Sequence, residues 1–338
     1  MNGQYSRPTT LQPTNAQGFT LVELMVAVAL GLLIVAGLSL LFSNSSRAGL
    51  ELDKSVRQIE SGRYAMDVMS EDIRHAGFYY EIPPLTYTFV TVDPCVSTVG
   101  ASGWDYASLK LPAGLMGASP TETSAFTCLP NAKTGTVAIA VHRLDTVTTS
   151  ASAVDGASIY IQTSRCSKDP VASLISVSTG AAQFTLRGQD CVTTQMVRRY
   201  VTRIYYVASC NECGVDTTPT LKRAEISGGT TTISPLAEGV DEIAFEYGFD
   251  TNNDGEPDVY RLGLSGTAAA ADNDWSNVVA VRPYLLTRTT EATAGFTDPK
   301  TYHLGLSGDR GPFSDNFKRR IYSSTVRLNN VAGPRETS

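Results

Sequence analysis

One stretch near the N-terminus, from Phe19 to Phe42, restricts the fold of this chain more than any other part of the sequence. It reads FTLVELMVAVALGLLIVAGLSLLF and carries a single charge, Glu23. From Leu24 to Phe42 no residue is charged and none is proline. As an α-helix this part would be about 28 Å long, close to the thickness of the hydrocarbon core of a bilayer. The stretch is therefore a cleaved secretory signal, a plain membrane anchor, or a helix that lies first in a membrane and later in a protein assembly.

The residues around the stretch argue against a secretory signal. Such a signal has a basic n-region, a short apolar run and a small-residue cleavage site after that run. Here the run is too long, Arg7 is the only basic residue before Gly18, and no site of the A-x-A type follows. The polar leader instead ends at Gly18, directly before the apolar run begins.

Glu23 is the second unusual feature of this stretch. A carboxylate inside a membrane segment is costly, so it is normally retained because another group pairs with it. The alternative is that Glu23 merely lies at the level of the lipid headgroups, near the end of the helix.

The remaining sequence has the composition of an exported, β-rich protein. Without its leader the 338-residue chain is still long enough for one large or two modest domains. The net charge of −6 argues against a nucleic-acid-binding surface, because phosphate binding requires clustered Lys and Arg. Charged residues make up only 18% of the chain, while Ser, Thr, Ala and Gly are abundant. This composition favours a secreted body that is rich in strands and loops.

All six cysteines lie beyond the apolar stretch, in the part that would be exported. An even number of cysteines in an oxidising compartment favours disulfides, and we expect sequence neighbours to pair. The C-N-E-C pair has two alternatives, half of a zinc site or a redox motif. Zinc needs two more ligands, and a redox CxxC is expected at a helix start, whereas this one follows a strand-like run. The expected disulfides are Cys95 with Cys128, Cys166 with Cys191, and Cys210 with Cys213.

Helical periodicity continues beyond the apolar stretch. No proline occurs between Pro13 and Pro83, and apolar residues recur at helical spacing in the second half of this segment. Charged residues, Glu71 and Asp72 among them, occupy the other face, and we interpret them as a solvated surface. The apolar stripe consists of Leu52, Val56, Ile59, Met66, Met69 and Ile73, with Gly62 in the gap of the pattern.

The predicted helix ends near Gly77, because glycine suits the left-handed conformation that closes many helices. From Phe19 to Ala76 the helix would be about 87 Å long. Few globular proteins need a helix of that length that is apolar throughout its first half and amphipathic in its second half. We therefore interpret it as a stem.

Beyond Phe78 the sequence changes to strand patterns separated by turn-rich loops. In the strand predicted at 240–249, Ile243 and Phe245 begin an alternation that indicates one buried face. Pro283, inside another predicted strand, indicates an edge position or a bulge. No internal repeat is present, and about the middle third of the chain, 84–194, carries no recognisable motif. The predicted strands are 86–92, 137–144, 158–163, 196–208, 221–226, 240–249, 278–289 and 320–328.

The loop from Asp250 to Asp258 carries oxygen side chains at alternating positions, with Gly255 after the third. This pattern begins an EF-hand-type calcium loop, in which hard oxygen ligands converge on the ion. Position twelve, however, is Arg261 where the EF-hand needs a glutamate, and no flanking helices are expected. The alternatives are a reduced calcium site and a tight turn, for which Asn, Asp and Gly are equally suited. The reduced site would use Asp250, Asn252, Asp254 and Asp258.

No enzymatic motif is visible in the sequence. His75, His142 and His303 are isolated, and none belongs to an H-E-x-x-H motif. There is neither a G-x-S-x-G nucleophile elbow nor a phosphate-binding glycine loop. We expect His75 to cap the stem helix, no catalytic residue, and no cofactor apart from the calcium alternative.

Several segments resemble known families. The motif G-F-T-L-V-E-L, which begins at Gly18, resembles the class III signal of type IV prepilins and type II secretion pseudopilins. The run GRYAMDVMSEDIRHAGFY, which begins at Gly62, resembles the "sDIR-AGy" region of the PilW group of minor pilins. The segments that begin at Val278 and Arg319 resemble the closing strands of PilW proteins and J-type pseudopilins.

This resemblance implies a fold, a processing site and an assembly residue. The fold would be α+β and pilin-like, with a long N-terminal α-helix packed on an antiparallel β-sheet head that carries additional β-rich elaborations. A prepilin peptidase would cut after Gly18 and methylate Phe19, and Glu23 would pair with the N-terminal amine of an adjacent subunit. The implied domains are a leader (1–18), a stem helix (19–77, with 19–42 in the membrane or filament core) and a β-rich head (78–338).

The implied function is that of a structural minor pilin that primes type IV pilus assembly, at or near the pilus tip. Its partners would be other minor pilins and the major pilin through the N-terminal helix, a tip adhesin, prepilin peptidase and the inner membrane, with no nucleic acid. It would start in the inner membrane with its head in the periplasm and end on the cell surface in a pilus, which serves adhesion and twitching motility. The alternatives are a J-like pseudopilin of a type II secretion system and a membrane-tethered periplasmic hydrolase.

Overall fold

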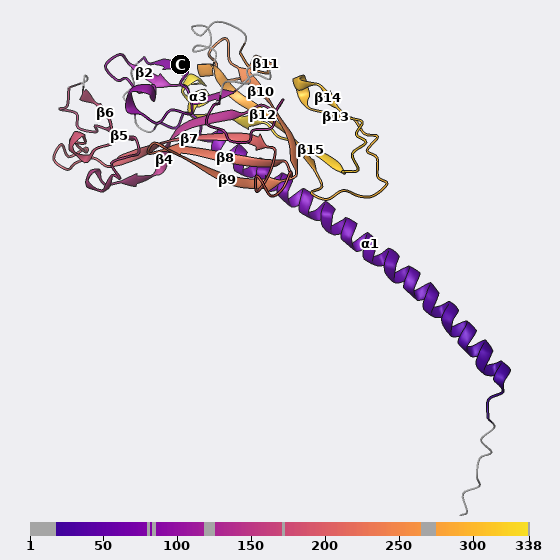
Figure 1. Ribbon diagram of the computed structural model, residues 1–338. Coiled ribbons are helices and arrows are strands. Elements are labelled where there is room, and N and C mark those ends of the chain that lie inside the picture. The colour runs from indigo at the N-terminus through magenta and orange to yellow at the C-terminus, as the bar shows by residue number, and fades with distance from the viewer. Residues whose placement is uncertain are drawn as a thin grey trace, which may run out of the picture. The chain divides into compact units, whose positions relative to one another are not determined.

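The structure, a computed structural model, describes residues 18–79, 82, 86–117, 126–170, 173–264 and 275–336. The leader predicted for residues 1–18 therefore lies outside the described residues, apart from Gly18. The chain divides into two compact units between Asp53 and Lys54. Helix α1 (Leu21–Arg74) runs through this boundary, and every strand lies in the second unit, Lys54–Ser338 (Figure 1).

The larger sheet of the second unit has seven strands, all in antiparallel pairs. Its order is β3-β4-β7-β5-β6, and β8 pairs with both β7 and β9. The strands are β3 (Leu115–Gly117), β4 (Ile139–Thr149), β5 (Tyr160–Thr163), β6 (Ile175–Ser178), β7 (Val197–Ala208), β8 (Thr220–Ser227) and β9 (Thr230–Glu238).

The second sheet has five strands and is also antiparallel throughout. Its order is β11-β10-β12-β15, and β16 pairs with β12 beyond the end of β15. The strands are β10 (Val240–Phe249), β11 (Val259–Arg261), β12 (Val278–Arg288), β15 (Arg319–Ser323) and β16 (Val326–Arg327).

Smaller elements surround the two sheets. Strands β1 (Thr88–Val90) and β2 (Lys110–Pro112) form a parallel pair, and β13 (Tyr302–His303) and β14 (Asp309–Arg310) form an antiparallel one. Helix α3 (Asn329–Glu336) ends the described chain. The 3-10 helices are η1 (Val99–Ala101), η2 (Ala151–Ala153), η4 (Ala181–Gln183) and η5 (Gly305–Ser307). The predicted α+β class, with a long N-terminal helix followed by an antiparallel β-rich body, is confirmed.

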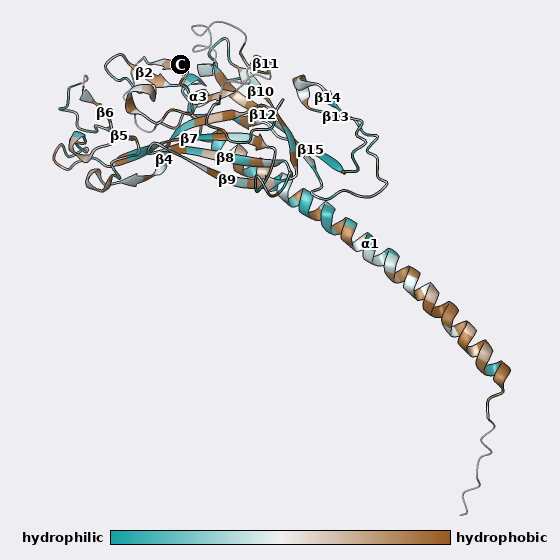
Figure 2. Cartoon of the chain, in the orientation of Figure 1, coloured by the Kyte–Doolittle hydropathy of each residue, from teal (hydrophilic) through white to brown (hydrophobic). Residues whose placement is uncertain are grey.

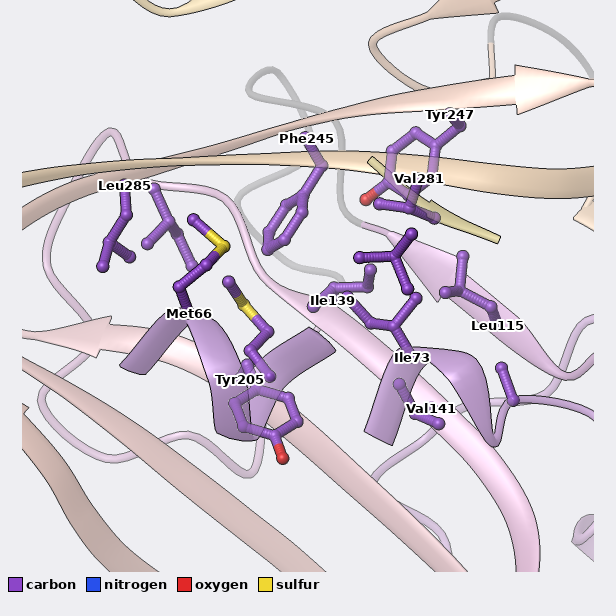
Figure 3. Packing of buried hydrophobic residues seen from close by; sticks show 14 of the residues in the cluster. Met66, Ile73, Leu115, Ile139, Val141, Tyr205, Phe245, Tyr247, Val281 and Leu285 are labelled. Carbon is purple, nitrogen blue, oxygen red and sulfur yellow. The ribbon is translucent and has the colours of Figure 1, made fainter. Parts of the chain in front are cut away.

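The last turns of α1 form the centre of the main apolar core. Met69 and Ile73 are completely buried and belong to a cluster with residues of β4, β7, β10 and β12. In Figure 3 Met66 and Ile73 point toward Phe245 and Val281 of the second sheet, while Tyr205 of the larger sheet lies on the other side of the helix. Full burial of such side chains stabilises a fold by about 1.5–3 kcal/mol each, so the two sheets and the helix depend on one another.

The apolar stripe predicted along the helix is buried only in its last part. Leu52 and Val56 are 68% and 50% exposed, and full burial begins at Gly62. A Cβ atom on Gly62 would lie 2.3 Å from the Tyr322 ring of β15, so the gap in the pattern is the point where a sheet side chain meets the helix backbone. The prediction for Leu52 and Val56 is wrong, because helical spacing shows which face is apolar and not how far the sheets cover it.

The helix ends as predicted. The N–H of Ala76 donates to the carbonyl of Ile73 (3.1 Å), and Gly77 then takes a positive φ of 70°. The N–H of Gly77 donates to the carbonyl oxygen of His142 in β4 (3.0 Å). The left-handed glycine therefore both closes α1 and joins the chain to the larger sheet.

Asp72 corrects the interpretation of the charged helix face as solvated. Glu71 is exposed, but Asp72 is only 4% exposed. Its carboxylate accepts hydrogen bonds from Arg203 of β7 (2.8 and 3.0 Å), from Arg143 of β4 (3.2 Å) and from the Tyr205 hydroxyl. Burial and the nearby carboxylate raise the pKa of Tyr205 far above its usual value, so this phenol remains a donor. A buried carboxylate persists because several charged donors compensate its desolvation.

Two further expectations for the second sheet are wrong. Strand β10 has the predicted bounds, but both of its faces are buried. Glu246, on the face predicted to be exposed, is 4% exposed and accepts a hydrogen bond from the N–H of Leu306 in η5 (2.7 Å). The segment around η5, more than fifty residues further along the chain, covers this face, and the alternation in β10 contains no sign of it.

Pro283 lies in an internal strand, neither at an edge nor at a bulge. It pairs with Phe245 of β10 without a register shift. The carbonyl oxygen of Pro283 accepts a hydrogen bond from the N–H of Ser324 (3.4 Å), so it points away from β10. The N–H and C=O of one strand residue point to the same side, so the N–H that proline lacks would also have pointed away from β10. On that side β15 has already ended and β16 has not begun, because they pair with 284–288 and 280–281 respectively. The interruption that proline requires is therefore in the neighbouring strand.

The six cysteines form three disulfides, and the pairs are those expected from sequence order. They join Cys95 to Cys128, Cys166 to Cys191, and Cys210 to Cys213. The C-N-E-C segment forms a disulfide-closed loop between β7 and β8.

Candidate functional site

The N-terminal end of α1 is held by a reciprocal pair of side chains. The backbone N–H and the hydroxyl of Thr20 both donate to the Glu23 carboxylate (2.9 Å each), and the N–H of Glu23 donates to the Thr20 hydroxyl oxygen (3.3 Å). This is a capping box, in which two side chains satisfy N–H groups that a helix start leaves free. The sequence carried its signal, T-x-x-E, and the sequence analysis missed it. Thr20 is therefore an additional residue of the candidate site.

The N-terminal half of α1 presents an apolar surface on all sides. Every residue from Leu21 to Phe42 is exposed, and Phe19 is 88% exposed. Figure 2 shows this part as almost continuously hydrophobic and the later part of the helix as mixed with hydrophilic residues. Among the described residues α1 is the one helix that is long and apolar enough to cross a membrane, judged by length and composition. A helix that is apolar all round needs lipid or protein around it.

The proposed calcium ligands form a turn whose oxygens already have partners. Asp250 accepts from the backbone N–H groups of Asn253 (2.6 Å) and Gly255 (3.0 Å), and it forms an ion pair with Arg335 of α3 (3.0 Å). Burial opposes ionisation, but the bonds from Arg335 and from these N–H groups outweigh it and lower the pKa of Asp250. Asp258 accepts from the N–H and the hydroxyl of Thr251, at 2.7 and 2.8 Å.

The other two residues complete the turn, because the Asn252 amide donates to Asp254 (3.0 Å). In the described part of the chain no group of three or more His, Cys, Asp or Glu side chains is placed to hold a metal ion. A cation at Asp250 would also have to displace the Arg335 guanidinium. Calcium binding at this loop stays a prediction of the sequence alone.

We expect the melting temperature of the protein to be the same in millimolar CaCl2 and in EGTA, because Arg335 and the backbone already neutralise Asp250. Calorimetry in the two buffers measures this, with Asp254→Asn as the matched variant. A ligand that binds only the folded state raises its stability by mass action. A rise with calcium that disappears in Asp254→Asn would therefore establish the site and contradict this expectation.

The three histidines lie in different surroundings. The ring of His75 bonds the carbonyl of Glu71 (2.9 Å) at the end of α1, as expected for a capping residue. His142 is buried between Thr202 and Tyr200, and burial lowers its pKa to about 4. His303 is exposed and lies 2.7 Å from Asp309.

Family models match the two ends of the chain. Residues 13–39 match the prokaryotic N-terminal methylation motif. Residues 204–330 match the family described as type IV pilus-assembly protein W, a region that begins in β7 and ends in α3. No curated protein matches the chain significantly. Among solved structures, a type IV-like pilin from Thermus thermophilus is similar with a TM-score of 0.36 and 11% identity, over 82% of this chain and 99% of that chain.

The first match defines a class, because the methylation motif covers Gly18, Phe19 and Glu23 and continues into the apolar part of α1. The chain has the N-terminus of a prepilin-type protein, which indicates membrane anchoring and association with a pilus. The second match is to a more specific family, and it confirms the resemblance to PilW proteins of type IV pilus assembly. Together the matches support the role of a minor pilin in pilus assembly.

Proposed function

We propose that this protein is a minor pilin that is made as an inner-membrane prepilin, cut between Gly18 and Phe19, and built into a type IV pilus at or near its tip. The observation that carries the proposal is the exposed apolar half of α1, which starts at the methylation motif. Such a surface is stable in lipid and equally stable among the apolar helices of other subunits.

Glu23 is the proposed assembly residue. In its own chain it is bound only by Thr20, within the described residues. A carboxylate transferred into an apolar environment needs a positive partner to offset its desolvation. Cleavage after Gly18 would create an amine at Phe19, and the amine of an adjacent subunit is the partner we assign to Glu23. The capping box keeps the carboxylate at the helix start, where such a partner can reach it.

The second unit would lie in the periplasm before assembly and on the cell surface afterwards. Its three disulfides support an oxidising compartment. Its role would be structural, namely to contact other minor pilins and the major pilin and to present a tip adhesin.

Replacing Glu23 by alanine tests the proposal. We expect Glu23→Ala to remain inserted in the membrane, because removal of a charge makes the apolar segment more compatible with lipid. The amount of the protein in sheared pili should fall roughly tenfold, which corresponds to about 1.4 kcal/mol of lost pairing. Immunoblots of the membrane and pilus fractions, together with counts of pili by electron microscopy, measure both quantities.

Glu60→Ala is the matched control, because Glu60 is an exposed carboxylate on the same helix. Glu60→Ala should change neither the amount of the protein in the membrane nor its amount in sheared pili. Normal incorporation of Glu23→Ala, with pilus numbers equal to those of the control, would contradict the assembly role of Glu23.

A further inference from the structure

Strand β9 is the longest of the described strands that lie at the ends of the two sheets. It has nine residues and, within the described part of the chain, pairs only with β8. The other strands at the ends of the two sheets, β3, β6, β11, β15 and β16, have two to five residues. Soluble proteins usually keep edge strands short, because an open edge presents unpaired backbone groups to other chains. A nine-residue edge is the exception here.

The first half of β9 also lacks the features that usually prevent another chain from pairing with an edge strand. No residue from 230 to 237 is charged, and Thr230, Thr231 and Thr232 are exposed. Charged side chains, prolines and bulges are the common devices that block an edge. Pro235 and the register shift between β8 and β9 lie in the second half of the strand. Residues 230–234 therefore contain no bulge, no proline and no charged side chain.

The turn before β9 defines which backbone groups face outward. Gly228 and Gly229 have φ of 59° and 74°, as in the tight two-residue turn of a hairpin, and Ser227 pairs with Thr230 next to it. Pairs in an antiparallel ladder alternate between bonded and non-bonded, so the next pair, Ile226 with Thr231, is non-bonded. The N–H and C=O groups of Thr231, and by the same alternation those of Ile233, therefore point away from β8.

We propose that residues 230–234 of β9 bind an extended strand of another subunit of the pilus assembly by β-sheet addition, an inference that rests on the proposed function. Thr231 and Ile233 offer two donors and two acceptors, which an antiparallel strand satisfies with its own backbone. The side chains of this partner strand are uncharged where they cover the edge, because β9 offers no charge to compensate a buried one.

The small size of the edge argues for a tethered partner. A strand pairing over about five residues buries much less than the roughly 1,200 Å² of a stable independent complex. Subunits that are already held together through their N-terminal helices have a high effective concentration for one another, so that a weak second contact is sufficient. The edge then fixes the orientation of the second unit relative to its neighbour.

A photo-crosslinking experiment in cells that assemble pili tests this inference. The full chain carries benzoylphenylalanine in place of the exposed Thr232, and the adduct is mapped by mass spectrometry. We expect the adduct to join β9 to an extended segment of another pilus subunit. Thr231→Pro removes one outward N–H and no bond to β8, so it should lower the adduct at least roughly fivefold, the effect of about one hydrogen bond.

Thr231→Val is the matched control, because it keeps the outward N–H, and it should leave the adduct within about twofold. Thr231→Lys serves as a second blocking variant that keeps the backbone donor, and equal melting temperatures of the purified variants show that each is folded. An adduct only with a second copy of this chain, an adduct outside β-paired segments, or equal adducts in Thr231→Pro and Thr231→Val would overturn the inference. Absence of the protein from the pilus fraction would instead contradict the proposed function.

Discussion

Replacing Asp72 by asparagine is expected to lower the free energy of unfolding by about 3–5 kcal/mol, the usual cost of removing one partner from a buried ion pair. The carboxylate receives hydrogen bonds from Arg143, Arg203 and Tyr205, and the Arg143 and Asp72 side chains are 10% and 5% exposed. Asparagine keeps the shape but removes the charge, so Arg143 loses its carboxylate partner, while Arg203 keeps only the ion pair with Glu225 (2.9 Å). Since a domain is commonly stable by only about 5–15 kcal/mol, this change removes a large part of the stability.

Urea unfolding of the detergent-solubilised full chain, followed by tryptophan fluorescence, measures this loss. The two tryptophans, Trp104 and Trp275, are both buried in the second unit, so their emission reports on its unfolding. Asp67→Asn is the control, because Asp67 is an exposed carboxylate on the same helix, and its effect should stay within about 0.5 kcal/mol. Equal midpoints for the two variants would show that the Asp72 cluster does not hold the helix to the sheet.

Replacing Gly114 by alanine is expected to destabilise the protein by about 1–3 kcal/mol or more, as overpacking of a closed interior does. A Cβ atom on Gly114 would lie 2.5 Å from the nitrogen and 2.7 Å from the Cα of Gly77, and 3.1 Å from the carbonyl carbon of Ala76. These neighbours are backbone atoms, so no side chain can rotate away. The helix end and the segment before β3 would have to separate, which also strains the hydrogen bond from His142 to the Gly114 carbonyl (2.9 Å).

Gly100→Ala is the matched control for this prediction. A Cβ atom at Gly100 meets nothing within 4 Å, and its φ is not positive. Such a glycine-to-alanine change stabilises a protein by about 0.4–1 kcal/mol, through the entropy of the unfolded chain. The two variants should therefore shift the urea midpoint in opposite directions. A shift of Gly114→Ala to higher urea concentration would contradict the close approach of the two segments.

Strands could be predicted from the sequence where runs of apolar residues lay between turn-rich loops. Strand β10 has its predicted bounds, β7 and β12 differ from theirs by one residue at one end, and β8 is one residue longer at each end. Strand β9 was not predicted, because its threonines and serine resemble a loop composition. Short strands such as β2 and β6 were not predicted either, and each of them pairs with a single neighbouring strand. Their conformation depends on pairing with another strand, and the few residues of each strand contain no pattern that shows this pairing.

The residues of the candidate site also differ in whether a local sequence pattern was sufficient to predict their role. Gly18, Phe19 and Glu23 form a local motif, so the sequence was sufficient to name them, and Thr20 could have been found through its capping spacing. The loop at Asp250 could not be resolved locally, since a calcium loop and a tight turn use the same residues. The group that neutralises Asp250 is Arg335, separated from it by 85 positions. Asp72 was misread for the same reason, because its partners come from β4 and β7.

The positions of the disulfides have a mechanical consequence. All six cysteines lie between Cys95 and Cys213, so no covalent cross-link joins α1 to any strand. If tension is applied along α1, the load reaches the sheets through two kinds of connection: the peptide chain that continues at Gly77, and the non-covalent contacts of the helix from Lys54 onward. The peptide chain does not break under such a load. The non-covalent contacts include Met69, Ile73 and the Asp72 cluster, together with the hydrogen bonds from Gln58 to Thr287 and Lys318. The resistance of this joint to pulling is therefore independent of the redox state of the surroundings.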